Sequence, residues 1–197
     1  MMKILTQFFL IACVLFSGVA QSQTPTQVLQ STVDQLIATI TDKQKSEQQQ
    51  YDKISQIIRD GVDFEYVSKR VVSRPWLEAS DVQKQQFIEK FSTILIDTYW
   101  KLLKNYSNER VEYGDEAIKK DKYAQVETHV ISEGKKIPVV YRLINSDGGW
   151  KIYDFIVEGS SLVNSYKNNY QVILNKNGMQ GLLEEMNKPK KATEADS

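Results

Sequence analysis

Apolar residues recur at helical spacing through the first half of the chain. Thr24 and the Gln three residues later form a capping box, and Pro25 stands at the first helical position, so a helix is predicted over about residues 25–45. A second capping box, at Ser80, begins the clearest apolar stripe of the chain, which continues to Tyr106. We expect this longest helix to be the spine of the domain.

Two shorter helices are predicted between these. One carries an apolar stripe from Tyr51 to Ile58 and ends at Gly61, a residue type that suits the left-handed conformation found after many helices. Asp63 can cap the next helix, and Pro75 ends it. This part of the chain is therefore predicted to be helical throughout.

After Asn108 the apolar residues alternate with a period of two, as in strands that cover a core with one face. The pattern predicts strands over residues 123–132, 137–143 and 150–157, with an edge strand over residues 110–113. This is a meander of about four antiparallel strands. The last strand is apolar on both faces in its second half, so we expect it to be covered on both sides or to border a cavity.

Helical spacing returns at Leu162 and is interrupted at Gly178. From residue 188 to residue 197 the chain is polar, which predicts a disordered tail. Residues 21–187 are thus expected to form a single α+β domain.

The first 20 residues are typical of an export signal. Lys3 precedes a mostly apolar run, and small residues close it, so we expect a signal peptide cleaved after Ala20. A membrane anchor is the alternative, but this run is shorter than the roughly 20 apolar residues that a spanning helix needs. Residues 10–13 resemble a lipobox, yet the apolar residues after Cys13 argue against lipidation.

Composition excludes several classes of chemistry. The 25 Lys and Arg balance the 25 Asp and Glu, so there is no basic excess for binding nucleic acid. One His and one Cys cannot supply a site that needs two imidazoles or two thiolates, which excludes the common zinc sites. We expect neither a metal nor a cofactor.

Asp154 is the most interesting ionisable residue, because it lies between aromatic residues on the predicted last strand. Buried carboxylates are normally paired, so we favour hydrogen bonds to turn amides or to Arg142. A general base is the alternative.

One segment carries a family resemblance. Residues 149–162, which read GWKIYDFIVEGSSL, resemble the MlaC family, also called the toluene-tolerance auxiliary family. The resemblance extends over essentially all of residues 25–187. Further agreement lies at Trp76, Ser80, Gln85, Gln86, Phe87, Phe91, Tyr99, Asn169, Tyr170 and residues 178–182. One departure is Val72-Ser73, where the family commonly has a Leu-Gly pair.

This resemblance implies helices packed on a highly curved antiparallel sheet, of cystatin-like or NTF2-like shape, with a deep apolar pocket between them. It also implies a non-enzymatic phospholipid carrier of the periplasm, a monomer with a bound phospholipid as its cargo. The implied partners are an outer-membrane lipoprotein–porin complex and an inner-membrane ABC transporter complex of the Mla system, which maintains the lipid asymmetry of the outer membrane. Such a carrier needs a dry cavity rather than catalytic groups, since each methylene exposed to water costs roughly 0.8 kcal/mol.

We expect the longest helix, the sheet and the following helix to form the pocket wall. The candidate lipid-binding residues are Phe91, Leu95, Tyr99, Val139, Tyr141, Leu143, Phe155, Val157, Leu162 and Tyr166. On this view, Leu143→Asp should abolish lipid binding and leave the protein folded.

Three alternatives stay open on sequence grounds. The cargo could be another apolar lipid, such as a hopanoid. An NTF2-like enzyme could use Asp154 as its base. An exported adaptor with a solid core would have neither ligand nor cavity.

Overall fold

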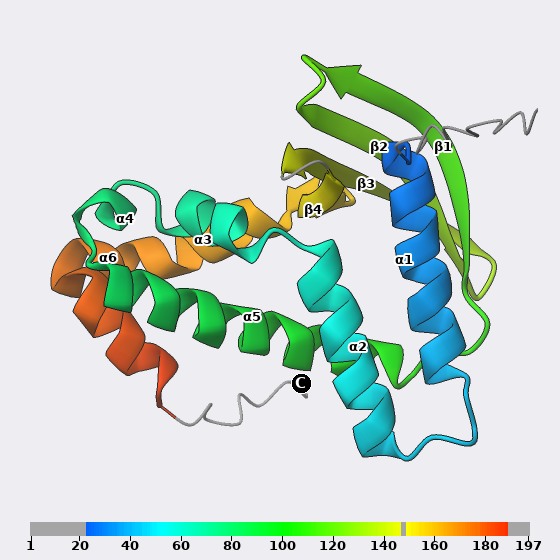
Figure 1. Cartoon of the computed structure of the whole chain (residues 1–197), viewed down its shortest axis with the longest axis horizontal. Coiled ribbons are helices and arrows are strands. Elements are labelled where there is room, and N and C mark those ends of the chain that lie inside the picture. Colours follow the sequence, from blue (N-terminus) through cyan, green and yellow to red (C-terminus); the bar gives the residue numbers. More distant parts are fainter. Residues whose placement is uncertain (1–22, 147–148, 189–197) are drawn as a thin grey trace, which may run out of the picture.

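The computed structural model describes residues 23–146 and 149–188. Within these residues, six helices and five strands form an α+β fold, which is the fold class predicted (Figure 1). The predicted signal peptide and all of the predicted tail except Lys188 lie outside the described residues. The elements are α1 Pro25–Ile40, α2 Glu47–Gly61, α3 Phe64–Val72, α4 Pro75–Glu78, α5 Asp81–Leu103, β1 Arg110–Lys119, β2 Tyr123–Ser132, β3 Lys135–Ser146, β4 Gly149–Val157, β5 Ser160–Ser161 and α6 Leu162–Met186.

The predicted capping boxes are confirmed. The hydroxyls of Thr24 and Ser80 accept hydrogen bonds from the backbone of the Gln three residues later, and each Gln side chain accepts from the cap in return. Ser46 makes the same arrangement at the start of α2. Each box satisfies two backbone N–H groups that a helix start otherwise leaves unpaired.

The structure shortens the predicted first helix, which stops at Ile40 rather than near residue 45. The side-chain amide of Gln50 donates to the carbonyls of Ile40 (3.2 Å) and Asp42 (3.1 Å). Asp42 also accepts from the backbone N–H of Gln44 (2.9 Å). These local hydrogen bonds compete with a continued helix.

Gly61 ends α2 as predicted, but not in a left-handed conformation. Val62 instead leaves the helix extended, with φ −113° and ψ 134°, and pairs with Ile152 in a parallel bridge. The backbone N–H of Asp63 donates to the carbonyl of Ile152 (2.9 Å), and the Asp63 carboxylate caps α3 by accepting from the N–H of Tyr66 (2.9 Å). A long-range contact with β4 therefore sets this helix end.

Two other predicted ends also move. α3 stops before Ser73, whose φ is 62°, and Pro75 begins the short α4 instead of ending α3. α5 stops at Leu103 rather than at Tyr106, whose hydroxyl donates to the carbonyl of Glu109 (3.1 Å) at the start of the sheet.

The sheet is an antiparallel meander in the order β1-β2-β3-β4-β5. It has one strand more than predicted, because the two residues of β5 pair with the end of β4. β1 is also longer than the predicted edge strand over residues 110–113. Its second half is exposed on both faces and so carries no alternating pattern, and a bulge lies between Tyr113 and Glu116.

The buried side chains form two clusters. The helical cluster joins α3, α4, α5 and α6 and is centred on Trp76, Phe87, Phe91 and Leu182. The sheet cluster lies between α1 and the sheet and contains Leu29, Ala124, Val126, Leu143 and Trp150. Figure 1 shows α5 and α6 side by side at one end of the molecule and α1 across the sheet at the other, with α2 between them.

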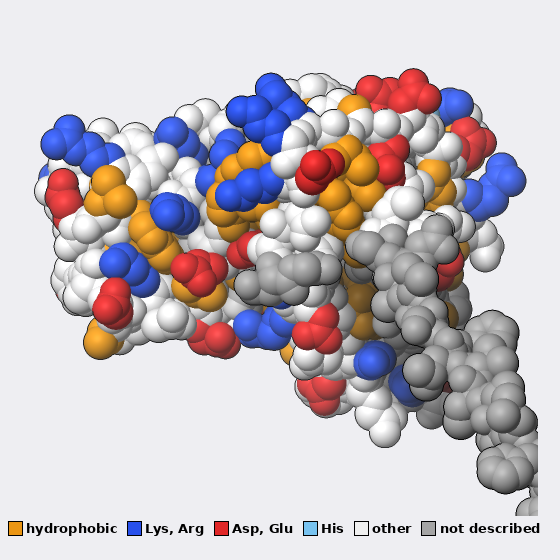
Figure 2. Space-filling model, turned by 45° about the horizontal axis from the view of Figure 1, so that its top comes forward, with side chains coloured by type: hydrophobic (Ala, Val, Ile, Leu, Met, Phe, Trp, Pro, Cys, Tyr) orange, Lys and Arg blue, Asp and Glu red, His pale blue; other side chains and the backbone are white. Residues whose placement is uncertain are grey.

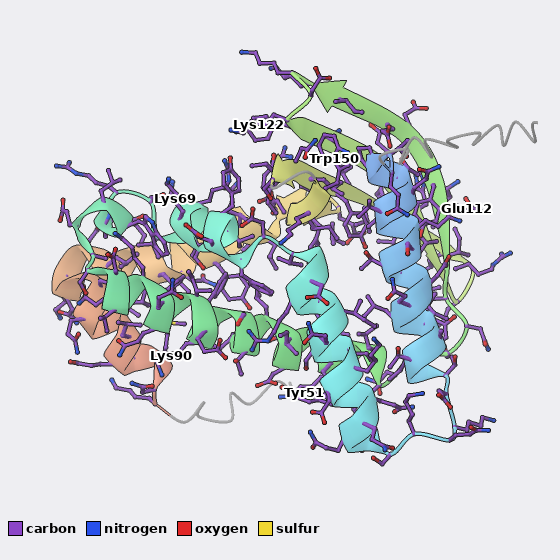
Figure 3. The ribbon with its side chains drawn as sticks, in the orientation of Figure 1. Tyr51, Lys69, Lys90, Glu112, Lys122 and Trp150 are labelled. Atoms are coloured by element: carbon purple, nitrogen blue, oxygen red, sulfur yellow. The ribbon has the colours of Figure 1, made fainter. Side chains whose placement is uncertain are left out.

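Two labelled aromatic residues mark these contacts in Figure 3. Trp150 lies beside α1, in the sheet cluster. Tyr51 lies where α2 meets α5: its hydroxyl donates to the carboxylate of Asp97 (2.7 Å), and its ring meets Trp100 edge-on with centroids 5.6 Å apart. α2 is thereby held against α5.

Candidate ligand-binding cavity

A cavity of about 620 Å³ lies between the helices and the sheet. Its wall combines residues of α1, α2, α3, the second half of α5 and the start of α6 with residues of β2, β3 and β4. Apart from Glu109, Ser132 and Asp154, every lining residue is aliphatic or aromatic. The volume lies within the range of about 300–1,000 Å³ that is usual for small-molecule sites.

One end of the cavity reaches the surface near the end of α5. Leu102 lines the cavity and is 63% exposed, whereas Leu95, two turns earlier on the same helix, is 4% exposed. Glu109 and Ser132 lie at this mouth: the carboxylate accepts from the N–H (2.8 Å) and hydroxyl (3.2 Å) of Ser107 and from the hydroxyl of Ser132 (3.4 Å). These hydrogen bonds lower the pKa of Glu109, with the backbone N–H of Ser107 the largest cause. The mouth therefore combines an apolar rim with an ionised carboxylate.

Seven of the ten predicted wall residues line the cavity. They come from α5, β3, β4 and the start of α6, as the helix-and-sheet wall requires. They are Leu95, Tyr99, Val139, Tyr141, Phe155, Val157 and Leu162.

Phe91, Tyr166 and Leu143 lie elsewhere. Phe91 and Tyr166 meet edge-on at 5.0 Å in the helical cluster, where α6 covers the first half of α5. Leu143 is 0% exposed in the sheet cluster, because α1 covers that part of the concave face. The Leu143→Asp test is therefore wrong as designed: a charge there would be buried in a solid core, not in a cavity.

The wall contributed by the first three helices and by the mouth was not predicted. The helical spacing of apolar residues puts Leu36, Ile58 and Val67 on the apolar faces of their helices, but periodicity identifies a covered face without saying what covers it. The remaining residues not predicted are Val62, Phe64, Leu102, Leu103, Tyr106, Glu109, Val130, Ser132, Ile137, Ile152, Tyr153 and Asp154.

Asp154 is paired, as favoured from the sequence. It is 2% exposed; its carboxylate accepts from the hydroxyl of Ser161 (2.8 Å) and the backbone N–H of Val163 (3.1 Å), and Arg142 lies 3.4 Å away. Both carboxylate oxygens are thus occupied in joining β4 to the first turn of α6. Negative charge is also favoured there by the dipole at the helix start.

Two tyrosines of the wall are strongly desolvated. Burial raises the pKa of Tyr99 and of Tyr141 well above the ordinary value, so both side chains are neutral hydroxyls at physiological pH. They can donate hydrogen bonds inside an otherwise apolar space.

The described residues offer little other chemistry. Across residues 23–146 and 149–188, no three His, Cys, Asp or Glu side chains gather closely enough to hold a metal ion. No helix within these same ranges has the length and apolar character to cross a membrane. Figure 2 shows hydrophobic side chains surfacing between mainly basic and mainly acidic groups, so this face carries mixed charge.

Comparison with known proteins places the chain. The family model for MlaC protein matches residues 30–188. The chain belongs to the MlaC family. Two members resemble it over most of their length. The intermembrane phospholipid transport system binding protein MlaC of Haemophilus influenzae is 25% identical over 188 residues, and the match covers 90% of this chain and 88% of that protein. The toluene tolerance protein ttg2D of Pseudomonas putida is 28% identical over 165 residues, covering 80% and 76%.

A solved structure shares the fold. The phospholipid-binding protein of Ralstonia solanacearum, determined at 1.53 Å in complex with a phospholipid, superposes with a TM-score of 0.73. It is 29% identical, and the match covers 81% of this chain and 92% of that one. The resemblance to the MlaC family seen in residues 149–162 is thereby confirmed, as is the α+β fold.

Proposed function

We propose that this MlaC-family protein binds a phospholipid with its acyl chains in the cavity and its headgroup at the mouth. The observation that carries the proposal is an apolar cavity of about 620 Å³ that opens at an exposed Leu102. Each buried methylene contributes roughly 0.8 kcal/mol, so ten of them supply about 8 kcal/mol of transfer free energy. The protein then acts without catalysis or a cofactor, and the phospholipid is its cargo.

We further propose that it carries lipid through the periplasm as a monomer, between the outer-membrane and inner-membrane complexes of the Mla system. This would maintain the lipid asymmetry of the outer membrane. Family membership and the name of the Haemophilus influenzae relative, a binding protein of an intermembrane phospholipid transport system, support this role. It requires export, for which the first 20 residues are suited, with cleavage after Ala20.

The first test is native mass spectrometry of the protein purified from the periplasm without detergent, followed by extraction of the bound material. We expect a discrete adduct that extracts as phospholipid. A hopanoid or another lipid in the extract would replace the proposed cargo. A bare protein that also takes up nothing from phospholipid vesicles would contradict lipid binding altogether.

A pair of matched variants tests the position of the site. Leu102→Asp places a charge at the mouth, and Leu77→Asp places the same charge on α4, outside the cavity; the two leucines are 63% and 76% exposed. Neither change should unfold the protein, since both side chains are largely in water. We expect Leu102→Asp to lower the lipid-bound fraction and Leu77→Asp to leave it unchanged. Equal lipid occupancy in both variants would place the site elsewhere.

A further inference from the structure

Tyrosine hydroxyls in the cavity wall lack a partner. Tyr153 on β4, whose ring lies under the guanidinium of Arg70, is one; Tyr99 on α5 and Tyr141 on β3 are two others, and within the described part of the chain none of the three hydroxyls makes a hydrogen bond. Other tyrosines do: Tyr51 donates to Asp97 (2.7 Å) and Tyr106 to the carbonyl of Glu109 (3.1 Å). A desolvated hydroxyl without a partner is unfavourable, and buried tyrosines usually find one. Because Tyr99 and Tyr141 line the cavity, a bound ligand can supply the acceptor that the protein does not.

The two rings are held on one scaffold. The ring of Phe155 meets that of Tyr99 at 5.3 Å and that of Tyr141 at 6.1 Å between centroids. Burial is the main cause of the raised pKa of Tyr99, followed by the neighbouring phenols of Tyr166 and then Tyr141. Because α5 and β3 supply them from opposite walls, a ligand between helix and sheet can contact both.

Their depth fits one part of a glycerolipid. Tyr99 precedes the exposed Leu102 by three residues, and the helical rise places it about 5 Å further in along α5. In a diacyl phospholipid the ester carbonyls lie on the glycerol, between the phosphate and the acyl chains. With the headgroup at the mouth and the acyl chains deeper, the ester groups lie just inside the mouth. Their carbonyl oxygens can accept hydrogen bonds from donors at that depth.

We propose that the hydroxyls of Tyr99 and Tyr141 donate hydrogen bonds to the ester carbonyl oxygens of the bound lipid and so select ester-linked over ether-linked glycerolipids. This inference rests on the proposed function, since it assumes a phospholipid in the cavity. An ether-linked lipid of the same shape fills the same volume but lacks the projecting carbonyl oxygens. Its ether oxygens can accept hydrogen bonds, but they lie within the chain, so the two hydroxyls lose the acceptors that the carbonyls place in reach.

The test compares dioctanoylphosphatidylethanolamine with its di-O-octyl ether analogue, each displacing a fluorescent phospholipid from the purified wild-type protein. We expect the diester to bind about tenfold more tightly, the effect of one or two hydrogen bonds to an acceptor inside the cavity. Equal affinities would overturn the inference and leave the proposed function standing. Failure of both lipids to bind would overturn the proposed function itself.

Phenylalanine variants assign the effect to these residues. Tyr99→Phe and Tyr141→Phe should each weaken binding of the diester about threefold and leave the ether unchanged, and the double variant should bind both lipids alike. Tyr113→Phe is the matched control, because it also removes a buried hydroxyl without a partner but lies outside the cavity wall. An ester preference that survives in the double variant, or that falls equally in Tyr113→Phe, would overturn the assignment. Because the wild-type comparison needs no variant, misfolding of a variant cannot obscure the result.

Discussion

The two halves of α5 carry the same apolar repeat but meet different surroundings. In the first half, Phe87 and Phe91 stack at 5.3 Å, and Trp76 and Tyr170 surround them in the solid helical cluster. In the second half, Tyr99 and its neighbours face a cavity of about 620 Å³. Apolar spacing thus determines which face of a helix is covered, whereas the partner element determines whether the space beyond is filled.

The partner of each half differs in shape. The first half packs against α6, and two helices can interdigitate at native density. The second half faces the concave side of the sheet, of which α1 covers only the part around Leu143 and Trp150. A single helix covers only a stripe of a broad sheet, so the part that is not packed against α1 borders the cavity.

The largest expected effect comes from a charge in the filled region. Leu143→Asp buries a carboxylate in the sheet cluster with no water to solvate it, which should cost several kcal/mol, enough to unfold a domain whose total stability is about 5–15 kcal/mol. Circular dichroism of the purified variant checks this. A folded Leu143→Asp protein would show that the sheet cluster is as open as the cavity and would break the comparison.

Two phenylalanine variants test the difference between the helical cluster and the cavity wall, with a smaller expected effect. Phe91→Ala in the helical cluster should lower the free energy of unfolding by about 3–5 kcal/mol, because the hole cannot close. Phe155→Ala should cost less, about 1–3 kcal/mol, because one side of that ring already faces the cavity and has fewer contacts to lose. Urea unfolding of the two variants gives both values. If Phe155→Ala cost as much as Phe91→Ala, the cavity wall would have to be as tightly packed as the helical cluster.

Asp154→Asn tests the junction between the two regions. The change removes the ionic contact with Arg142 and weakens the hydrogen bonds that fix the start of α6, so we expect a loss of about 1–3 kcal/mol in urea unfolding. Lipid content measured by native mass spectrometry should not change. A variant of unchanged stability that had lost its biological activity would instead favour the enzyme hypothesis.

The smallest expected effect is that of Tyr113→Phe. Its hydroxyl is buried without a hydrogen-bond partner, so removing it should leave stability unchanged or raise it by up to about 1 kcal/mol. Thermal unfolding followed by circular dichroism measures the change. A clear loss of stability would reveal a partner for this hydroxyl and would show that the sheet cluster is more polar than its buried residues indicate.

Much of the fold could be predicted because its signals are local. The capping boxes at Thr24 and Ser80, the strand over residues 123–132 and the break at Gly178, where φ is 63°, depend on residues close in sequence. The errors lie where distant segments decide. The conformation in which the chain leaves α2 depends on Ile152, and the second half of β1 is exposed on both faces and leaves no pattern.

The candidate site divides in the same way. The sequence by itself determined which side chains are apolar, which face of each helix and strand they share, and therefore that Leu95, Tyr99 and Phe155 would be covered. Only the tertiary structure decided that these three border a cavity while Phe91, Tyr166 and Leu143 fill a core. The physical reason is that the apolar period of a segment decides which of its side chains are covered. Whether the space beyond them is filled depends on which distant elements pack against that face and how much of it they cover.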